Sequence, residues 1–136
     1  MTKMLWNQEM GVGVQELDED HKELVTLLNE VEDATATGQR RDSINEIVDR
    51  LMESVKTHFA REEAFLVEFG YPGAAAHQCE HDLMLRTGLE LQARFRSDSS
   101  PMISLESVSS LRSWLDNHIQ GADRQYGPHL NTHGVY

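Results

Sequence analysis

The chain of 136 residues is poor in cysteine, proline and basic residues. Its one cysteine, Cys79, excludes an internal disulfide and is typical of a reducing cytoplasm. With 12 basic against 23 acidic residues the formal net charge is −11, which disfavours binding to nucleic acids or anionic membranes. No apolar run reaches transmembrane length, and residues 1–10 lack the apolar core of a secretory signal. We therefore expect a soluble, cytoplasmic protein with no nucleic acid partner and no membrane insertion.

The length and the apolar pattern predict one all-α domain. A chain of 136 residues has room for one hydrophobic core, so we expect a single domain over residues 1–136. It has no internal repeat and no useful strand-like alternation. Apolar residues recur at helical spacing after an extended N-terminal segment, which predicts helices over 18–37, 42–69, 74–96 and 102–122. Short connections between them favour an antiparallel up-down-up-down four-helix bundle.

The predicted helix ends rest on local signals. Asp18 is suited to cap the first helix, and Gly38 is suited to the left-handed residue that follows its last turn. The second helix has the most regular stripe, with steps of three and four residues through Ile44, Val48, Leu51, Val55, His58, Glu62, Phe65 and Phe69. One face of this helix is therefore expected to point into the core, together with the polar residues on it.

Five of the seven histidines form a pattern with two carboxylates. The set comprises His21, His58, Glu62, His77, His81, His118 and Asp123. Each predicted helix contributes to it, early in the first and third helices and late in the second and fourth. Antiparallel helices bring such positions to the same end of a bundle. Burying so many polar groups without metal would be costly, so the pattern predicts a site for two metal ions.

The spacing of His118 and Asp123 departs from an ideal helix. They are five positions apart, which at 3.6 residues per turn rotates them away from each other. Either the helix is distorted near Gly121, or Asp123 reaches the metals from the edge of the stripe.

Four other residues with reactive or polar side chains are expected to lie outside the site. Cys79 falls between His77 and His81, but two positions along a helix turn it away from them. Glu63 is expected on the surface. The remaining histidines, His129 and His133, follow turn-forming residues and are expected in a solvated tail.

The chain resembles the single-domain bacterial hemerythrins. The resemblance rests on Trp6, Asp18-Glu19-Asp20-His21-Lys22, His58-Phe59-Ala60-Arg61-Glu62-Glu63, Gly70-Tyr71-Pro72, Trp114 and His118-Ile119. It implies a non-haem di-iron centre bridged by Glu62, Asp123 and an oxo or hydroxo group. By the same resemblance, one iron is bound by His77, His81 and His118. The other is bound by His21 and His58, which leaves it one open position.

The function implied by the resemblance is reversible O₂ binding for oxygen transport, storage or buffering, not enzymatic turnover. Leu115 and Trp114 are expected to line the O₂ pocket, although ordinary core packing accounts equally well for Trp114. A protein partner that receives O₂ is compatible with this function. The alternatives are a di-iron redox enzyme acting on peroxide or nitric oxide, and an oxygen or iron sensor. No additional acid, base or thiol is aimed at the site, which favours binding over turnover.

Overall fold

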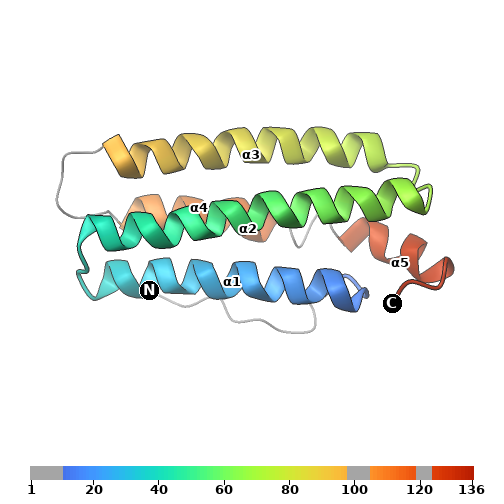
Figure 1. Cartoon of the computed structure of the whole chain (residues 1–136), viewed down its shortest axis with the longest axis horizontal. Coiled ribbons are helices and arrows are strands. Elements are labelled where there is room, and N and C mark those ends of the chain that lie inside the picture. Colours follow the sequence, from blue (N-terminus) through green and yellow to red (C-terminus); the bar gives the residue numbers. More distant parts are fainter. Residues whose placement is uncertain (1–10, 98–104, 119–123) are drawn as a thin grey trace.

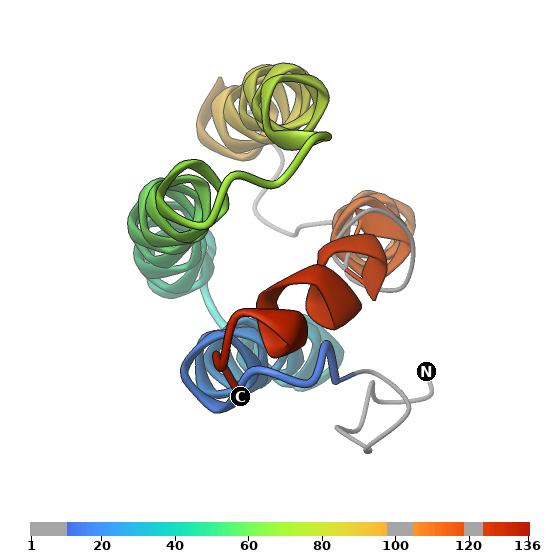
Figure 2. The same cartoon turned by 90° about the vertical axis from the view of Figure 1, so that its right-hand side faces the viewer.

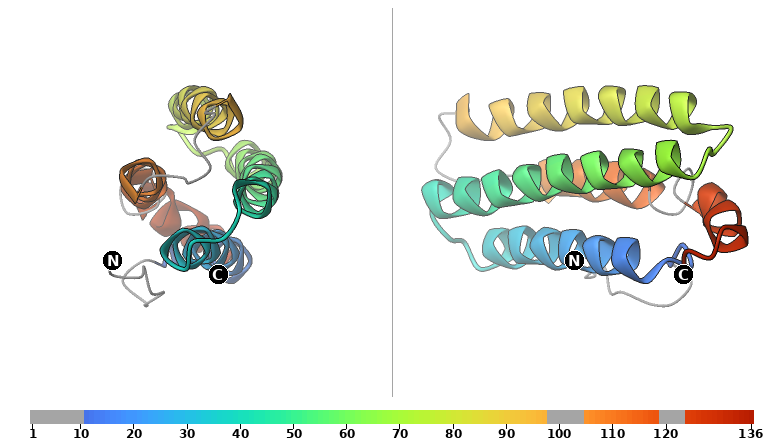
Figure 3. Two further views of the ribbon diagram at one scale, coloured as in Figure 1. Left: turned by 90° about the vertical axis from the view of Figure 1, so that its left-hand side faces the viewer. Right: turned by 45° about the vertical axis from the view of Figure 1, so that its right-hand side comes forward.

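The computed structural model describes residues 11–97, 105–118 and 124–136. These residues form five helices and no strand. The helices are α1 (Gln15–Ala36), α2 (Arg41–Glu68), α3 (Ala74–Ser97), α4 (Leu105–His118) and α5 (Arg124–Thr132). The first four run antiparallel, side by side, as a bundle (Figures 1 and 3), so the predicted fold class is confirmed. The short α5 crosses one end of this bundle (Figure 2).

The first helix begins earlier than predicted. α1 starts at Gln15, with Val14 at the N-cap position. Asp18 therefore lies in the first turn and does not cap the helix. The Asp18 Oδ1 instead accepts a hydrogen bond of 2.7 Å from the backbone N–H of Val12, which fastens residues 11–14 to the helix. After the helix end, Gly38 has the predicted left-handed conformation, with φ 70°.

The other predicted helices agree with the structure to within a residue or so where it describes them. α2 begins and ends one residue earlier than 42–69, and α3 extends one residue beyond 74–96. α4 covers 105–118 of the predicted 102–122, and the remainder of that range lies outside the described residues, as does the N-terminal segment 1–10. No helix in the described part of the chain is long and apolar enough to cross a membrane.

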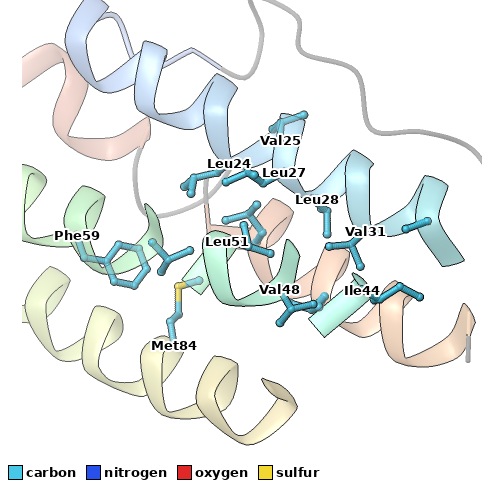
Figure 4. Packing of buried hydrophobic residues seen from close by; sticks show 14 residues of the cluster. Leu24, Val25, Leu27, Leu28, Val31, Ile44, Val48, Leu51, Phe59 and Met84 are labelled. Carbon is cyan, nitrogen blue, oxygen red and sulfur yellow. The ribbon is translucent and has the colours of Figure 1, made fainter. Parts of the chain in front are cut away.

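Two apolar clusters lie on either side of the histidines. The larger one fills the bundle between α1, α2 and α4, with Met84 joining it from α3 (Figure 4). The smaller one consists of Val12, Val14, Leu17, Leu66, Tyr126 and Leu130. Along α1, His21 falls between Leu17 of the smaller cluster and Leu24 of the larger one. The layer of buried histidines therefore has apolar side chains on both sides along the bundle, which strengthens electrostatic interactions within this layer.

The helix α5 corrects the expectation that His129 and His133 lie in a solvated tail. Pro128 lies inside α5, where it has no backbone N–H to donate to the preceding turn. Tyr126 and Leu130 are fully buried. His129 is half-buried, and its Nε2 lies 2.7 Å from the Phe69 carbonyl oxygen, so only His133 is exposed as predicted. The sequence did not predict this helix, because its turn-forming residues favour a loop. Its stability depends on packing against the end of the bundle that it covers.

Candidate metal centre

Six of the seven predicted ligands meet at one end of the bundle, the end that α5 crosses in Figure 1. They form two groups, one of Glu62, His77, His81 and His118, the other of His21, His58 and Glu62. Within each group the possible ligand atoms lie within 4.8 Å of one another, and all six side chains are buried. The seventh, Asp123, and the distortion expected near Gly121 lie outside the described residues.

Glu62 belongs to both groups because its two oxygens face in different directions. Its Oε1 contacts His77 Nε2 and lies 3.0 Å from His81 Nε2. Its Oε2 lies 2.8 Å from His58 Nε2 and 3.6 Å from His21 Nε2. One carboxylate oxygen thus serves each histidine group, which is the arrangement that a bridging ligand requires.

The chemistry of these donors fits metal ions. A carboxylate only accepts hydrogen bonds, so every imidazole nitrogen that faces Glu62 would need a proton in the absence of metal. The His81 Nε2 also lies 3.2 Å from the His118 Nε2, and two such nitrogens attract each other only if just one of them is protonated. A metal ion accepts electron pairs from imidazole nitrogen and carboxylate oxygen alike, and so satisfies both groups. The residues present therefore fit a pair of cations.

An aromatic ring covers the inner side of the site. Phe59, next to His58 on α2, stacks on the His81 ring with a centroid distance of 3.8 Å and an interplanar angle of 2°. Its ring also meets His118 edge-on at 5.4 Å. Phe59 belongs to the larger apolar cluster, so it fixes two imidazole planes and separates them from water.

The protonation of the site reflects burial and hydrogen bonding together. Burial raises the pKa of Glu62, but hydrogen bonds from the four surrounding histidines outweigh this effect and hold it well below the usual value of 4.5. Burial lowers the pKa of His58, but hydrogen bonds to Asp20 and Glu62 outweigh it and raise the pKa above the usual 6.5. The carboxylate is therefore charged at neutral pH and available as a ligand.

The raised pKa of His58 predicts how pH affects the metal-free protein. Because the folded-state pKa exceeds the unfolded value, the group contributes stability that is complete below about pH 6.5 and is lost as the pH rises through the folded-state pKa. The free energy of unfolding, measured by urea denaturation without metal, should fall across this window. The fall should be smaller in His58→Gln and unchanged in His133→Gln, whose histidine is exposed. An identical slope in His58→Gln would contradict the assignment.

Sequence reasoning missed three carboxylates that lie near the outer nitrogens of site histidines, that is, near the Nδ1 atoms, while the Nε2 atoms face the centre of the site. Asp20 Oδ2 lies 2.9 Å from His58 Nδ1. Glu63 lies 3.4 Å from His81 Nδ1 and is half-buried, so its assignment to the surface was wrong. An exposed residue, Glu80, lies 3.5 Å from His118 Nδ1. Such outer partners commonly orient histidine ligands.

Tyr126 was also missed. Its hydroxyl donates a hydrogen bond of 3.0 Å to Glu62 Oε2, and its side chain is fully buried. Continuing the helical phase beyond Asp123 could have pointed to it, since Tyr126 follows three residues later. The hydroxyl fixes the orientation of the carboxylate that joins the two histidine groups.

The two residues expected at an O₂ pocket have different surroundings. Leu115 is fully buried in the larger apolar cluster, one turn before His118 on α4. Trp114 is half-buried and donates from Nε1 to the Met84 carbonyl oxygen at 2.9 Å. A Cβ on Gly88 would lie 3.0 Å from Trp114 Cζ2, so that glycine admits the indole. Trp114 thus has a packing role between α4 and α3.

The single thiol lies outside the site. Cys79 is exposed on α3, as its position between His77 and His81 predicted. It is therefore not among the side chains that could hold a metal here.

The fold and the site together define a class of protein: a helical bundle whose buried histidines and shared glutamate can hold metal ions. The family model described as the hemerythrin HHE cation binding domain matches residues 12–130. The chain therefore belongs to the hemerythrin family. Family membership and the histidine and glutamate groups together support a non-haem iron protein that binds oxygen.

Several relatives cover nearly the whole chain. A bacteriohemerythrin of Methylococcus capsulatus is 34% identical, and the match covers 97% of this chain and 100% of the relative. A bacteriohemerythrin of Stenotrophomonas maltophilia is 31% identical over 98% of this chain and 85% of its own length. The crystal structure of a wild-type hemerythrin matches with a TM-score of 0.84 at 34% identity, and the match covers 95% of this chain and 98% of that one.

Proposed function

We propose that this protein binds O₂ reversibly at a non-haem di-iron centre and serves oxygen transport, storage or buffering. The ligands proposed for the two iron ions are His21, His58, Glu62, His77, His81, His118 and Asp123. The observation that carries the proposal is the shared Glu62, whose two oxygens face separate histidine groups in a buried layer. The family supports the same metal, because hemerythrins bind iron without haem.

The side chains of the site have separate roles in the proposed O₂ binding. An iron pair supplies exchangeable binding of O₂ coupled to electron transfer, and imidazole and carboxylate donors suit iron. Glu62 would bind both metal ions, and Tyr126 orients the Glu62 carboxylate by donating a hydrogen bond to it. Phe59 and Leu115 exclude water from the inner side of the site. Excluding water favours release of bound O₂ unchanged over its reaction with water. We propose Leu115 as a wall of the O₂ pocket and Trp114 as support behind it.

The remaining parts of the proposal concern context. We propose one hemerythrin-like domain over residues 1–136, located in the cytoplasm, with O₂ as its ligand and a protein partner that receives it. Turnover of peroxide or nitric oxide, or sensing of oxygen or iron, would use the same centre. Cys79, the one cysteine of the chain, is exposed and lies outside the site, so no thiol is available there for redox turnover, which favours a binding protein.

The test is anaerobic reconstitution with ferrous iron followed by cycles of O₂ admission and removal. We expect two irons per chain and a visible ligand-to-metal absorption that appears with O₂ and disappears on its removal. His77→Gln should bind less iron and develop no such absorption. Rapid, irreversible oxidation of the iron would contradict the carrier function and support a redox enzyme. Binding of a single zinc in preference to two irons would contradict the di-iron centre.

A further inference from the structure

Asp20 on α1 contacts the outer nitrogen of a histidine that faces Glu62. Its Oδ2 lies 2.9 Å from His58 Nδ1, while His58 Nε2 lies 2.8 Å from Glu62 Oε2. A carboxylate has no proton to donate, so the bond to Asp20 requires a proton on Nδ1. In the neutral imidazole this leaves the lone pair on Nε2, the atom directed at the metal position. Asp20 therefore selects the tautomer that ligation needs.

Asp20 is itself fixed by a cation. Arg61 Nη1 donates to the other carboxylate oxygen, Oδ1, at 2.8 Å. Arg61 and His58 are three positions apart on α2, so both partners of Asp20 lie on one face of that helix. Arg61 also lies 3.8 Å from Glu16 Oε1 on α1. Each oxygen of Asp20 thus has one partner, which holds the carboxylate in a defined orientation.

The contact with His58 differs from those of the other outer carboxylates. The distances of 3.4 Å from Glu63 to His81 and 3.5 Å from Glu80 to His118 exceed the usual range for a charged hydrogen bond. Asp20 also lines a pocket of about 250 Å³, together with Glu23, Ser54, Thr57, His58 and Arg61. Its side chain is 15% exposed, so an isosteric substitution there does not disturb the apolar core.

We propose that Asp20 is a positioning residue of the metal centre, acting through His58. It fixes the imidazole tautomer and plane, and its negative charge makes His58 a stronger electron donor to the metal, which lowers the reduction potential of the centre. The inference rests on the proposed function, because it needs a metal at the His58 Nε2.

The variant Asp20→Asn removes the charge and keeps the shape. Its affinity for Co²⁺, measured by competition with a chelator, should fall by about tenfold or more, as is usual when an outer partner of a ligand is lost. The midpoint potential of the iron-loaded protein should rise. Asp20→Glu retains the charge and should recover part of both properties, which distinguishes a loss of charge from a loss of folding.

The matched control is Glu30→Gln. Glu30 Oε2 forms a 2.9 Å ion pair with Arg50, which also joins α1 to α2, but both side chains are exposed and distant from the histidines along their helices. This variant should leave the Co²⁺ affinity and the midpoint potential unchanged. If Asp20→Asn behaves like Glu30→Gln, the proposal is wrong. A weaker Co²⁺ affinity with an unchanged potential would reduce Asp20 to a structural role and would also overturn it.

The two proposals can fail separately. Binding of Co²⁺ does not require that the protein bind O₂. A wild-type protein with no reversible O₂ absorption, whose Asp20→Asn variant still shows the weaker affinity and the higher potential, would contradict the oxygen function and support the role of Asp20. Reversible O₂ absorption with no effect of Asp20→Asn would do the opposite.

Discussion

Glu62→Gln is expected to abolish binding of the metal pair. The amide keeps the shape of the carboxylate but carries no charge, and its nitrogen cannot serve as the second bridging oxygen. Loss of an outer partner of a metal ligand commonly weakens metal affinity by about 10–100-fold, so loss of the shared ligand should exceed about 100-fold. Iron analysis after anaerobic reconstitution should find fewer than two ions per chain, and the O₂-dependent absorption should be absent.

The same substitution should also lower stability without metal. The charged Glu62 carboxylate accepts hydrogen bonds from His77 and Tyr126, and a hydrogen bond to a charged group contributes about 1.5–3 kcal/mol. We expect a loss of about 2 kcal/mol in the free energy of unfolding, and metal should no longer raise the melting temperature. Glu68→Gln is the control, because Glu68 is exposed at the end of the same helix. Full loading of Glu62→Gln with two irons would refute the bridging assignment.

Gly127→Ala is expected to detach α5 from the N-terminal segment. A Cβ at Gly127 would lie 1.9 Å from the Val12 carbonyl oxygen, and because this atom belongs to the backbone the clash cannot be relieved by turning a side chain. Overpacking of this kind costs about 1–3 kcal/mol, and the upper end applies here. The displaced helix would carry Tyr126 away from Glu62, so iron affinity should fall along with the free energy of unfolding.

Gly134→Ala separates this clash from backbone strain. Gly134 has φ 80°, and a Cβ added there would have nothing within 4 Å, so alanine meets strain of about 1 kcal/mol but no neighbour. It should leave iron affinity unchanged. Equal effects of the two variants on stability and iron binding, by denaturation and metal analysis, would show that the contact between Gly127 and Val12 is not what seats Tyr126.

The sequence alone predicted most of the residues that converge in the candidate metal centre, because the pattern is local. His58 and Glu62 are four positions apart on one helix, and the geometry of the helix places them on one face whatever surrounds it. The apolar residues before and after them indicated that this face is buried. The antiparallel order of the helices then placed early and late ligands at one end, where the structure has them.

The contacts that refine the site could not be predicted in this way. The pairing of Asp20 with His58 depends on how α1 is rotated against α2, and helical spacing within either helix does not fix that rotation. Aspartate commonly caps helices, so Asp18 was predicted to cap α1. Its carboxylate instead accepts a hydrogen bond from the backbone N–H of Val12. Interactions between residues distant in the chain decided both cases.

What the sequence by itself determined was the helical bundle and the identity of six buried, converging donors, since both follow from the period of the α-helix and the burial of its apolar stripe. Only the tertiary structure decided that residues 124–132 form α5 and that Tyr126 donates to Glu62. The physical reason is that this short helix contains Gly127 and Pro128 and has little intrinsic helical preference. It is stable because it covers the end of the bundle, and that surface exists only after the other helices have packed.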